Sequence, residues 1–147
     1  MKAIYFDMDG TIANFYGVPN WLECLQREDP SPYKEAKPLV NMSVLARYLN
    51  ILHSYGYHVG IVSWMSKTST ARFDEATKNA KLQWLKSHLK SVHWDEIKII
   101  PYGTPKHKAV LYAEEGHLFD DEQGNRANWT GIAHDETQIL EILKGLL

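Results

Sequence analysis

The chain has 147 residues, of which 44% are hydrophobic and 23% charged, and it contains a single cysteine, Cys24. This composition excludes a disordered chain and a disulfide-rich one, and the length predicts one domain over residues 1–147. No run approaches the ~20 apolar residues that cross a bilayer, so we expect a cytoplasmic protein without a signal peptide or a membrane partner.

The formal net charge is −2, but the charges are unevenly distributed. Residues 67–108 carry nine basic and four acidic side chains, whereas residues 109–147 carry two and eight. Such an asymmetry indicates either an anionic partner or a helix with a solvated lysine face. Charge alone therefore does not choose a class of partner.

Short apolar runs alternate with amphipathic stretches along the chain. The apolar runs are rich in β-branched or aromatic residues and predict buried strands at 3–6, 59–62, 97–100, 117–119 and 131–133. Helical spacing of apolar residues predicts helices over 44–52, 73–89 and 139–146, the first of them capped by Asn41 or Ser43.

Residues 12–41 differ from the rest, because four of the six prolines lie there and the apolar pattern is weak. We interpret this segment as a small flap or reduced cap after the first strand, with a short helix near 20–28. The alternation elsewhere predicts an α/β fold, a three-layer doubly wound parallel sheet with helices on both faces. Ligands bind such sheets at the carboxyl ends of the strands.

The first predicted strand ends in Asp7-Met8-Asp9-Gly10-Thr11. Two carboxylates so close to a buried strand repel each other unless a cation or a proton lies between them. Oxygen ligands of this kind suit Mg²⁺, so we predict a magnesium site here. The alternative is a plain Asp-Gly turn followed by a helix cap.

The next strand ends supply further polar groups. The second ends in Ser63-Trp64, where the hydroxyl and the N–H groups of a helix beginning there would bind phosphate oxygens. Lys106 follows the third strand, directly after Pro105, with Lys108 as the alternative. Asp120 and Asp121 follow the fourth.

An acid pair, a hydroxyl, a lysine and a second acid pair, in this order, resemble the four motifs of the haloacid dehalogenase (HAD) superfamily. The Asp7–Thr11 loop carries most of the resemblance, which covers roughly residues 3–121. It implies a Rossmann-like core and a phosphatase. Asp7 matches the nucleophile, which becomes an aspartyl-phosphate, and Asp9 matches the general acid and base.

The resemblance also implies the remaining roles. Ser63 and Lys106 match the groups that hold the transferring phosphoryl group. Asp120 matches a Mg²⁺ ligand, together with the Asp7 carboxylate and the Asp9 main-chain carbonyl, and Asp121 matches an acid that reaches the metal through water or orients the site.

Three hypotheses on function follow. The first is a Mg²⁺-dependent phosphomonoesterase for a small phosphorylated substrate. A nucleotide is one candidate, because residues 7–17 are similar to the 5′-deoxyribonucleotidase branch of the superfamily. The aromatic side chains of Phe15, Tyr16 and Trp21 either stack on a base or pack beneath the flap. The second is a phosphatase for polynucleotide ends, which the basic segment favours. The third is a non-catalytic phosphate-binding or regulatory domain; receiver domains lack the Asp7–Thr11 loop pattern.

Overall fold

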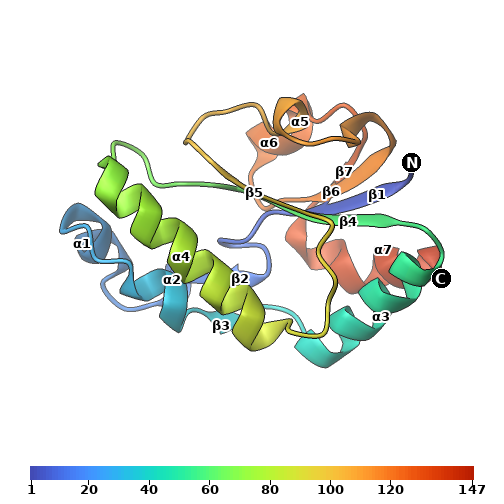
Figure 1. Cartoon of the computed structure of the whole chain (residues 1–147), viewed down its shortest axis with the longest axis horizontal. Coiled ribbons are helices and arrows are strands. Elements are labelled where there is room, and N and C mark those ends of the chain that lie inside the picture. Colours follow the sequence, from blue (N-terminus) through green and yellow to red (C-terminus); the bar gives the residue numbers. More distant parts are fainter.

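The computed structural model describes residues 1–147 and is built around one parallel sheet of five strands (Figure 1). The strand order is β5-β4-β1-β6-β7, and all four pairings are parallel. The strands are β1 (Ala3–Phe6), β4 (His58–Trp64), β5 (Glu96–Ile100), β6 (Gly116–Phe119) and β7 (Ile132–His134). Every predicted apolar run overlaps a strand, so the predicted sheet is confirmed. The burial predicted for all five strands is wrong for β5 and β7, which are partly exposed because they form the edges of the sheet.

Helices cover both faces of the sheet, as predicted (Figure 1). On one face lie α3 (Met42–Ser54), α4 (Ala71–His88) and α7 (Ile139–Leu146). On the other lie α5 (Lys106–Ala109), the 3-10 helix η2 (Ala113–Glu115) and α6 (Gln123–Asn128), and η3 (Glu136–Gln138) precedes α7. None of these helices is long and apolar enough to span a membrane.

The larger core lies between the sheet and the three long helices. Leu45, Leu49 and Leu52 project from one face of α3, are fully buried, and pack in one cluster with Ile4 and Phe6 of β1. The Asn41 side chain accepts a hydrogen bond from Val44 N–H at 3.2 Å and caps this helix. Burial of these leucines, at roughly 1.5–3 kcal/mol each, fixes the helix against the strand that carries the first acid pair.

The segment between β1 and α3 forms a small lobe beside α4, at the left of Figure 1. It contains β2 (Ala13–Asn14), η1 (Phe15–Gly17), α1 (Trp21–Gln26), α2 (Ser31–Glu35) and β3 (Lys37–Pro38). Phe15 and Tyr33 stack with their ring centroids 4.6 Å apart and share a buried cluster with Phe73 of α4. The lobe is therefore attached to α4 by its own small core.

One local prediction is wrong: no helix begins at Ser63-Trp64. Both residues belong to β4, where they pair with Ile99 and Ile100 of β5. The following helix begins at Ala71, because Thr70 supplies the N-cap hydroxyl and accepts a hydrogen bond from Phe73 N–H at 3.2 Å. Residues 65–70 form an intervening loop, so the polar groups near Ser63 do not include a helix N-terminus.

Candidate active site

The loop after β1 is a tight turn that brings its polar residues to the carboxyl end of the sheet. The N–H groups of Thr11, Ile12 and Ala13 all approach the Met8 carbonyl at 3.0–3.1 Å. Gly10 has a φ of +80°, and a Cβ there would lie 2.5 Å from Asp121 Oδ2. Glycine is therefore required both by the backbone conformation and by the closeness of the second acid pair.

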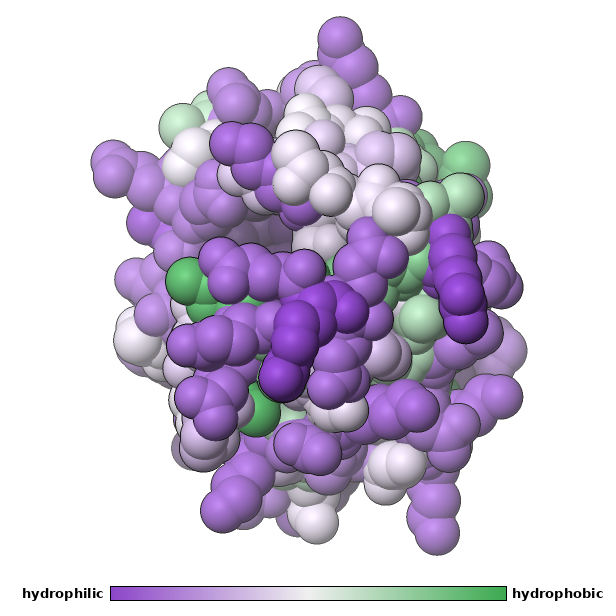
Figure 2. All heavy atoms as spheres, turned by 90° about the vertical axis from the view of Figure 1, so that its left-hand side faces the viewer, coloured by the Kyte–Doolittle hydropathy of each residue, from purple (hydrophilic) through white to green (hydrophobic).

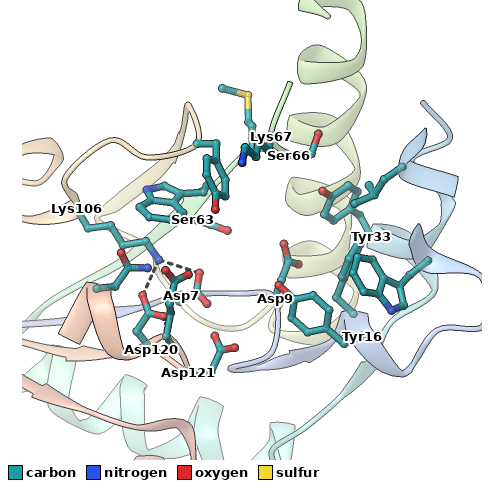
Figure 3. A pocket seen from close by; sticks show the side chains of 18 residues that line it. Asp7, Asp9, Tyr16, Tyr33, Ser63, Ser66, Lys67, Lys106, Asp120 and Asp121 are labelled. Carbon is teal, nitrogen blue, oxygen red and sulfur yellow. Dashed lines mark hydrogen bonds and ion pairs between the residues drawn. The ribbon is translucent and has the colours of Figure 1, made fainter. Parts of the chain in front are cut away.

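Two acidic loops meet at this point (Figure 3). The side-chain oxygens of Asp7, Asp120 and Asp121 come within 4.8 Å of one another. The Thr11 hydroxyl lies 3.0 Å from Asp7 Oδ2 and 3.1 Å from Asp121 Oδ1, and it accepts a hydrogen bond from Asp121 N–H. Strands β1 and β6 are neighbours, so adjacency in the sheet brings together acids that are more than 110 residues apart in the sequence.

Lys106 lies between these acids, and Lys108 does not. The Lys106 ammonium donates hydrogen bonds to Asp7 Oδ1 at 3.0 Å and to Asp120 Oδ2 at 2.6 Å, and its side chain is 3% exposed. Lys108 is exposed on α5. Burial alone would raise the pKa of Asp7, but the Lys106 ammonium, the contact with Asp121 and the Lys81 ammonium together lower that pKa, which keeps the carboxylate ionised.

A residue that sequence analysis did not single out, Lys81, completes the site. Its ammonium donates to Ser63 Oγ at 2.7 Å, to the Trp64 carbonyl at 2.8 Å and to Asp9 Oδ2 at 2.9 Å. All three of its N–H donors are thereby used, and the residue is 1% exposed. It lies 5.1 Å from the centroid of the Tyr33 ring, so this one cation touches α2, β4 and the loop after β1.

The charges around the site are unbalanced. Four carboxylates (Asp7, Asp9, Asp120 and Asp121) face two ammonium groups, which leaves an excess of two negative charges when all are ionised. Burial raises the pKa of Asp120 to about 6 and that of Asp121 to about 7, and the Asp7 carboxylate adds to both increases. A divalent cation held by oxygen ligands would offset this excess, so the donor set fits Mg²⁺.

Asp9 is in a different environment from Asp7. Burial raises the pKa of Asp9; Lys81 opposes the rise and the Asp7 carboxylate adds to it. The side chain is 18% exposed, so it faces the pocket. One acid of the first pair is therefore held ionised by its lysine, while the other is biased toward its protonated form, a division that suits a nucleophile and a proton donor.

Aromatic residues enclose the pocket into which these groups open. Phe15, Tyr16, Trp21 and Tyr33 line it on the lobe side, and Trp64 and Tyr102 line it on the other. Phe15 is buried in the core of the lobe, whereas Tyr16 is 54% exposed. The face of the molecule at this end is largely hydrophilic and hollowed near its centre (Figure 2). Of the two alternatives left open for the lobe aromatics, packing accounts for Phe15, whereas the Tyr16 side chain is accessible from the pocket.

The raised pKa of Asp121 predicts a pH-dependent effect of Asp121→Asn on stability without metal. The folded protein binds a proton on the Asp121 carboxyl more tightly than the unfolded chain does. The stabilisation that this proton provides is therefore lost as pH rises from about 4 to about 7. Asparagine avoids that loss and keeps an oxygen for Thr11. In EDTA at pH 8, urea unfolding should show the variant more stable than the parent by on the order of 2 kcal/mol, and the difference should vanish near pH 4. Equal stability at pH 8 would contradict this account of the acid cluster.

Comparisons with known proteins give structural neighbours only. No family model and no curated protein matches the chain. The D,D-heptose 1,7-bisphosphate phosphatase from Burkholderia thailandensis superposes with a TM-score of 0.61 at 14% identity, covering 99% of this chain and 98% of that one. A chain of a Pnkp1/Rnl/Hen1 complex superposes with a TM-score of 0.55 at 17% identity, covering 91% of this chain and 45% of that one. With the observed strand order, these superpositions show that the chain shares the α/β fold of the heptose bisphosphate phosphatase.

Proposed function

We propose that this protein is a Mg²⁺-dependent phosphomonoester hydrolase that works through an aspartyl-phosphate at Asp7. The observation that carries the proposal is the contact of the buried Asp7 carboxylate with the Lys106 ammonium, 3.0 Å away, beside Asp120 and Asp121. A purely structural ion pair does not need two further carboxylates at the same point, since each adds repulsion. A site that binds a divalent cation beside a phosphoryl group does need several carboxylates, because they are the ligands of the cation.

The metal would be held by the side chains of Asp7, Asp120 and Asp121 and by the Asp9 main-chain carbonyl. A bound Mg²⁺ supplies charge neutralisation, which lets an anionic nucleophile approach a phosphate dianion. Lys106 and the Ser63 hydroxyl bind the remaining phosphoryl oxygens, with the main-chain N–H of Trp64 as a further donor.

The chain's own residues account for the proton transfers. An Asp7 carboxylate oxygen attacks phosphorus, the ester P–O bond breaks, and protonated Asp9 gives its proton to the departing alkoxide oxygen. Asp9, now ionised, takes a proton from the water that attacks the phosphorus of the aspartyl-phosphate. That step releases inorganic phosphate and restores both the Asp7 carboxylate and the protonated Asp9.

Lys81 positions two of these groups, and Lys81→Met should lower phosphate release on the order of 10²-fold. Without the ammonium, Asp9 and Ser63 lose the donor that fixes them, 2.9 Å and 2.7 Å away. Lys86→Met, which removes an exposed lysine from the same helix, is the matched control and should keep full activity. Steady-state kinetics on both variants, with circular dichroism to show folding, makes the comparison. If folded Lys81→Met released phosphate at a rate within threefold of the parent rate, Lys81 would not be a positioning residue for Asp9 and Ser63.

Within this proposal we favour a small substrate, with a nucleoside monophosphate first among the candidates. The exposed Tyr16, together with Trp21 and Trp64 around the same pocket, supports a stacking site for a base beside the acids. The neighbour named as a heptose bisphosphate phosphatase makes sugar phosphates the second class to test. Polynucleotide ends remain the alternative substrate, and a phosphate-binding domain without catalysis remains the alternative function.

A substrate panel separates these possibilities. Phosphate release is measured from nucleoside 5′- and 3′-monophosphates, sugar phosphates, 3′-phosphorylated oligonucleotides and p-nitrophenyl phosphate, each with Mg²⁺ and with EDTA. The proposal expects Mg²⁺-dependent release, fastest from a nucleoside monophosphate. Preference for oligonucleotides, with a steep salt dependence, would select polynucleotide ends. No release from folded protein on any substrate would favour a binding role and overturn the proposal.

A further inference from the structure

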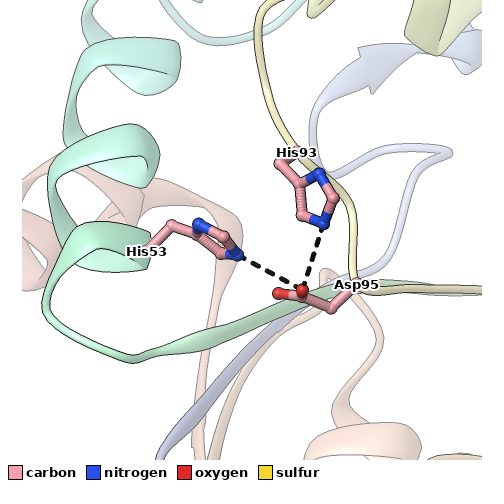
Figure 4. A group of neighbouring side chains, drawn as sticks. All are labelled: His53, His93 and Asp95. Atoms are coloured by element: carbon pink, nitrogen blue, oxygen red, sulfur yellow. Dashed lines mark hydrogen bonds and ion pairs between the residues drawn. The ribbon is translucent and has the colours of Figure 1, made fainter.

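Three potential metal ligands, His53, His93 and Asp95, point toward one another in a second cluster (Figure 4). His53 comes from the last turn of α3, while His93 and Asp95 come from the segment just before β5. This is the amino-terminal side of β4 and β5, whereas the acids described above lie at the carboxyl ends of the strands. The cluster is therefore separate from the candidate active site and independent of the proposed function.

The distances in this cluster match those between two ligands of one metal ion, and the His53–Asp95 contact is also a hydrogen bond. His53 Nε2 lies 3.2 Å from Asp95 Oδ1, and His93 Nε2 lies 3.4 Å from the same oxygen. Charge-assisted N–H···O bonds are shorter, at about 2.7–2.9 Å. Two ligand atoms that each lie about 2.0–2.1 Å from a tetrahedral Zn²⁺ are about 3.3 Å apart. The third edge, between the two imidazole nitrogens, is at most 4.8 Å.

Asp95 is held in place to receive such an ion. Its Oδ2 accepts a hydrogen bond from Val59 N–H at 2.9 Å, and its own N–H donates to the Val59 carbonyl at 2.8 Å. These two bonds fix the residue to the start of β4 and leave Oδ1 for the histidines. The His93 side chain is 68% exposed, so a fourth ligand position is open to water.

We propose that His53, His93 and Asp95 form a binding site for a late first-row divalent cation, with Zn²⁺ as the expected ion. Two neutral imidazoles and one carboxylate suit Zn²⁺, whereas Mg²⁺ prefers an all-oxygen set. The bound ion would link the C-terminal turn of α3 to the entry of β5, two segments about 40 residues apart in the sequence. Its role is to stabilise the fold at this end of the sheet.

The test is a calorimetric titration of the full chain with Zn²⁺ in a large excess of Mg²⁺, which competes with Zn²⁺ for the acids at the carboxyl ends of the strands. One equivalent should bind with micromolar or tighter affinity. His53→Gln and His93→Gln should each weaken it by more than the roughly 10–100-fold that outer-shell changes cost. Asp121→Asn and His88→Gln are matched controls: the first changes the acid cluster, the second removes a histidine at the end of α4, and both should bind Zn²⁺ normally.

Thermal unfolding gives a second readout, since an ion that binds only the folded chain raises its melting temperature. Zn²⁺ should raise the melting temperature of the parent and of His88→Gln, but not that of His93→Gln. His93 is exposed, so its variant stays folded even if His53→Gln does not. Absence of zinc binding by the parent at micromolar concentrations would overturn the proposal. So would parent-like zinc affinity in His93→Gln, which would place the ion elsewhere.

Discussion

Asp7→Asn should reduce phosphate release by a factor on the order of 10⁵–10⁶, the scale found when a catalytic nucleophile is removed. The substitution is nearly isosteric, but an amide oxygen is a poor nucleophile and cannot form the acyl phosphate. The variant should also fold well, because it removes one of the charges that raise the pKa values of Asp120 and Asp121. Initial rates on the preferred substrate of the panel, measured in Mg²⁺, give the comparison.

Two features make this result specific to the nucleophile. Substrate binding should survive in Asp7→Asn, because Lys106, Ser63 and the other acids are unchanged, so equilibrium binding serves as the control for an intact pocket. Asp9→Asn should lose less activity, about 10²–10⁴-fold, since it removes proton transfer and leaves the attack possible. An Asp7→Asn protein with a tenth or more of the parent rate would show that Asp7 is not the nucleophile.

Lys106→Met should lower kcat/KM by about 10³-fold, at the upper end of what a single electrostatic donor contributes. Lys106 is the only cation that donates hydrogen bonds to the carboxylates of Asp7 and Asp120, at 3.0 Å and 2.6 Å. Without it the pKa of Asp7 rises, so less of the nucleophile is ionised, and the phosphoryl group loses a ligand. The rate of the variant should consequently recover in part as pH is raised.

Lys108→Met is the matched control for this prediction, because Lys108 lies two residues away on the same short helix but is exposed. It should keep the parent kcat and KM. The two variants also test whether Lys106 or Lys108 is the lysine of the third motif, a question that the sequence left open because both residues follow Pro105. Loss of activity in Lys108→Met with a normal Lys106→Met would reverse the assignment.

Much of the fold could be predicted because local pattern and tertiary role agree. Runs such as Ala3–Phe6 are fully buried, and buried parallel strands are recognisable as short apolar segments between turn residues. The convergence of Asp7, Asp120 and Asp121 could be predicted for a related reason, because an acid directly after a buried strand lies at the carboxyl end of the sheet. The order of the strands then brings those ends together.

Lys81 was missed because its surroundings in the sequence are those of a surface helix. It lies in the basic stretch 67–108, where a solvated lysine face is the ordinary interpretation. The sequence did contain one indication, because Lys81 lies four residues before the apolar Leu85 and therefore on the same face of the helix. In the structure Thr77, Lys81 and Leu85 are all buried on the inner face of α4. Its partners Asp9 and Ser63 come from other elements, and only the tertiary packing shows them.

The lobe and the loop after β4 were hard to predict for a different reason. The short helix predicted near 20–28 is α1, but α2 was not predicted, because its five residues are too few for apolar periodicity to be visible. The end of β4 was misplaced because Ser63 resembles a helix cap, although Thr70 takes that role. Such local choices are decided by pairing with β5 and packing against α4, which a linear pattern does not contain.

The most direct test of the central claim is to capture the phosphoryl group on the protein. The chain is mixed with its preferred substrate and Mg²⁺, quenched in acid within a single turnover, and digested for mass spectrometry. The account predicts a phosphorylated peptide whose modification maps to Asp7, which is absent in Asp7→Asn and accumulates in Asp9→Asn, where hydrolysis is slowed. Turnover without any phosphorylated peptide in either Asp9→Asn or the parent, or a phosphoryl group on another residue, would contradict it.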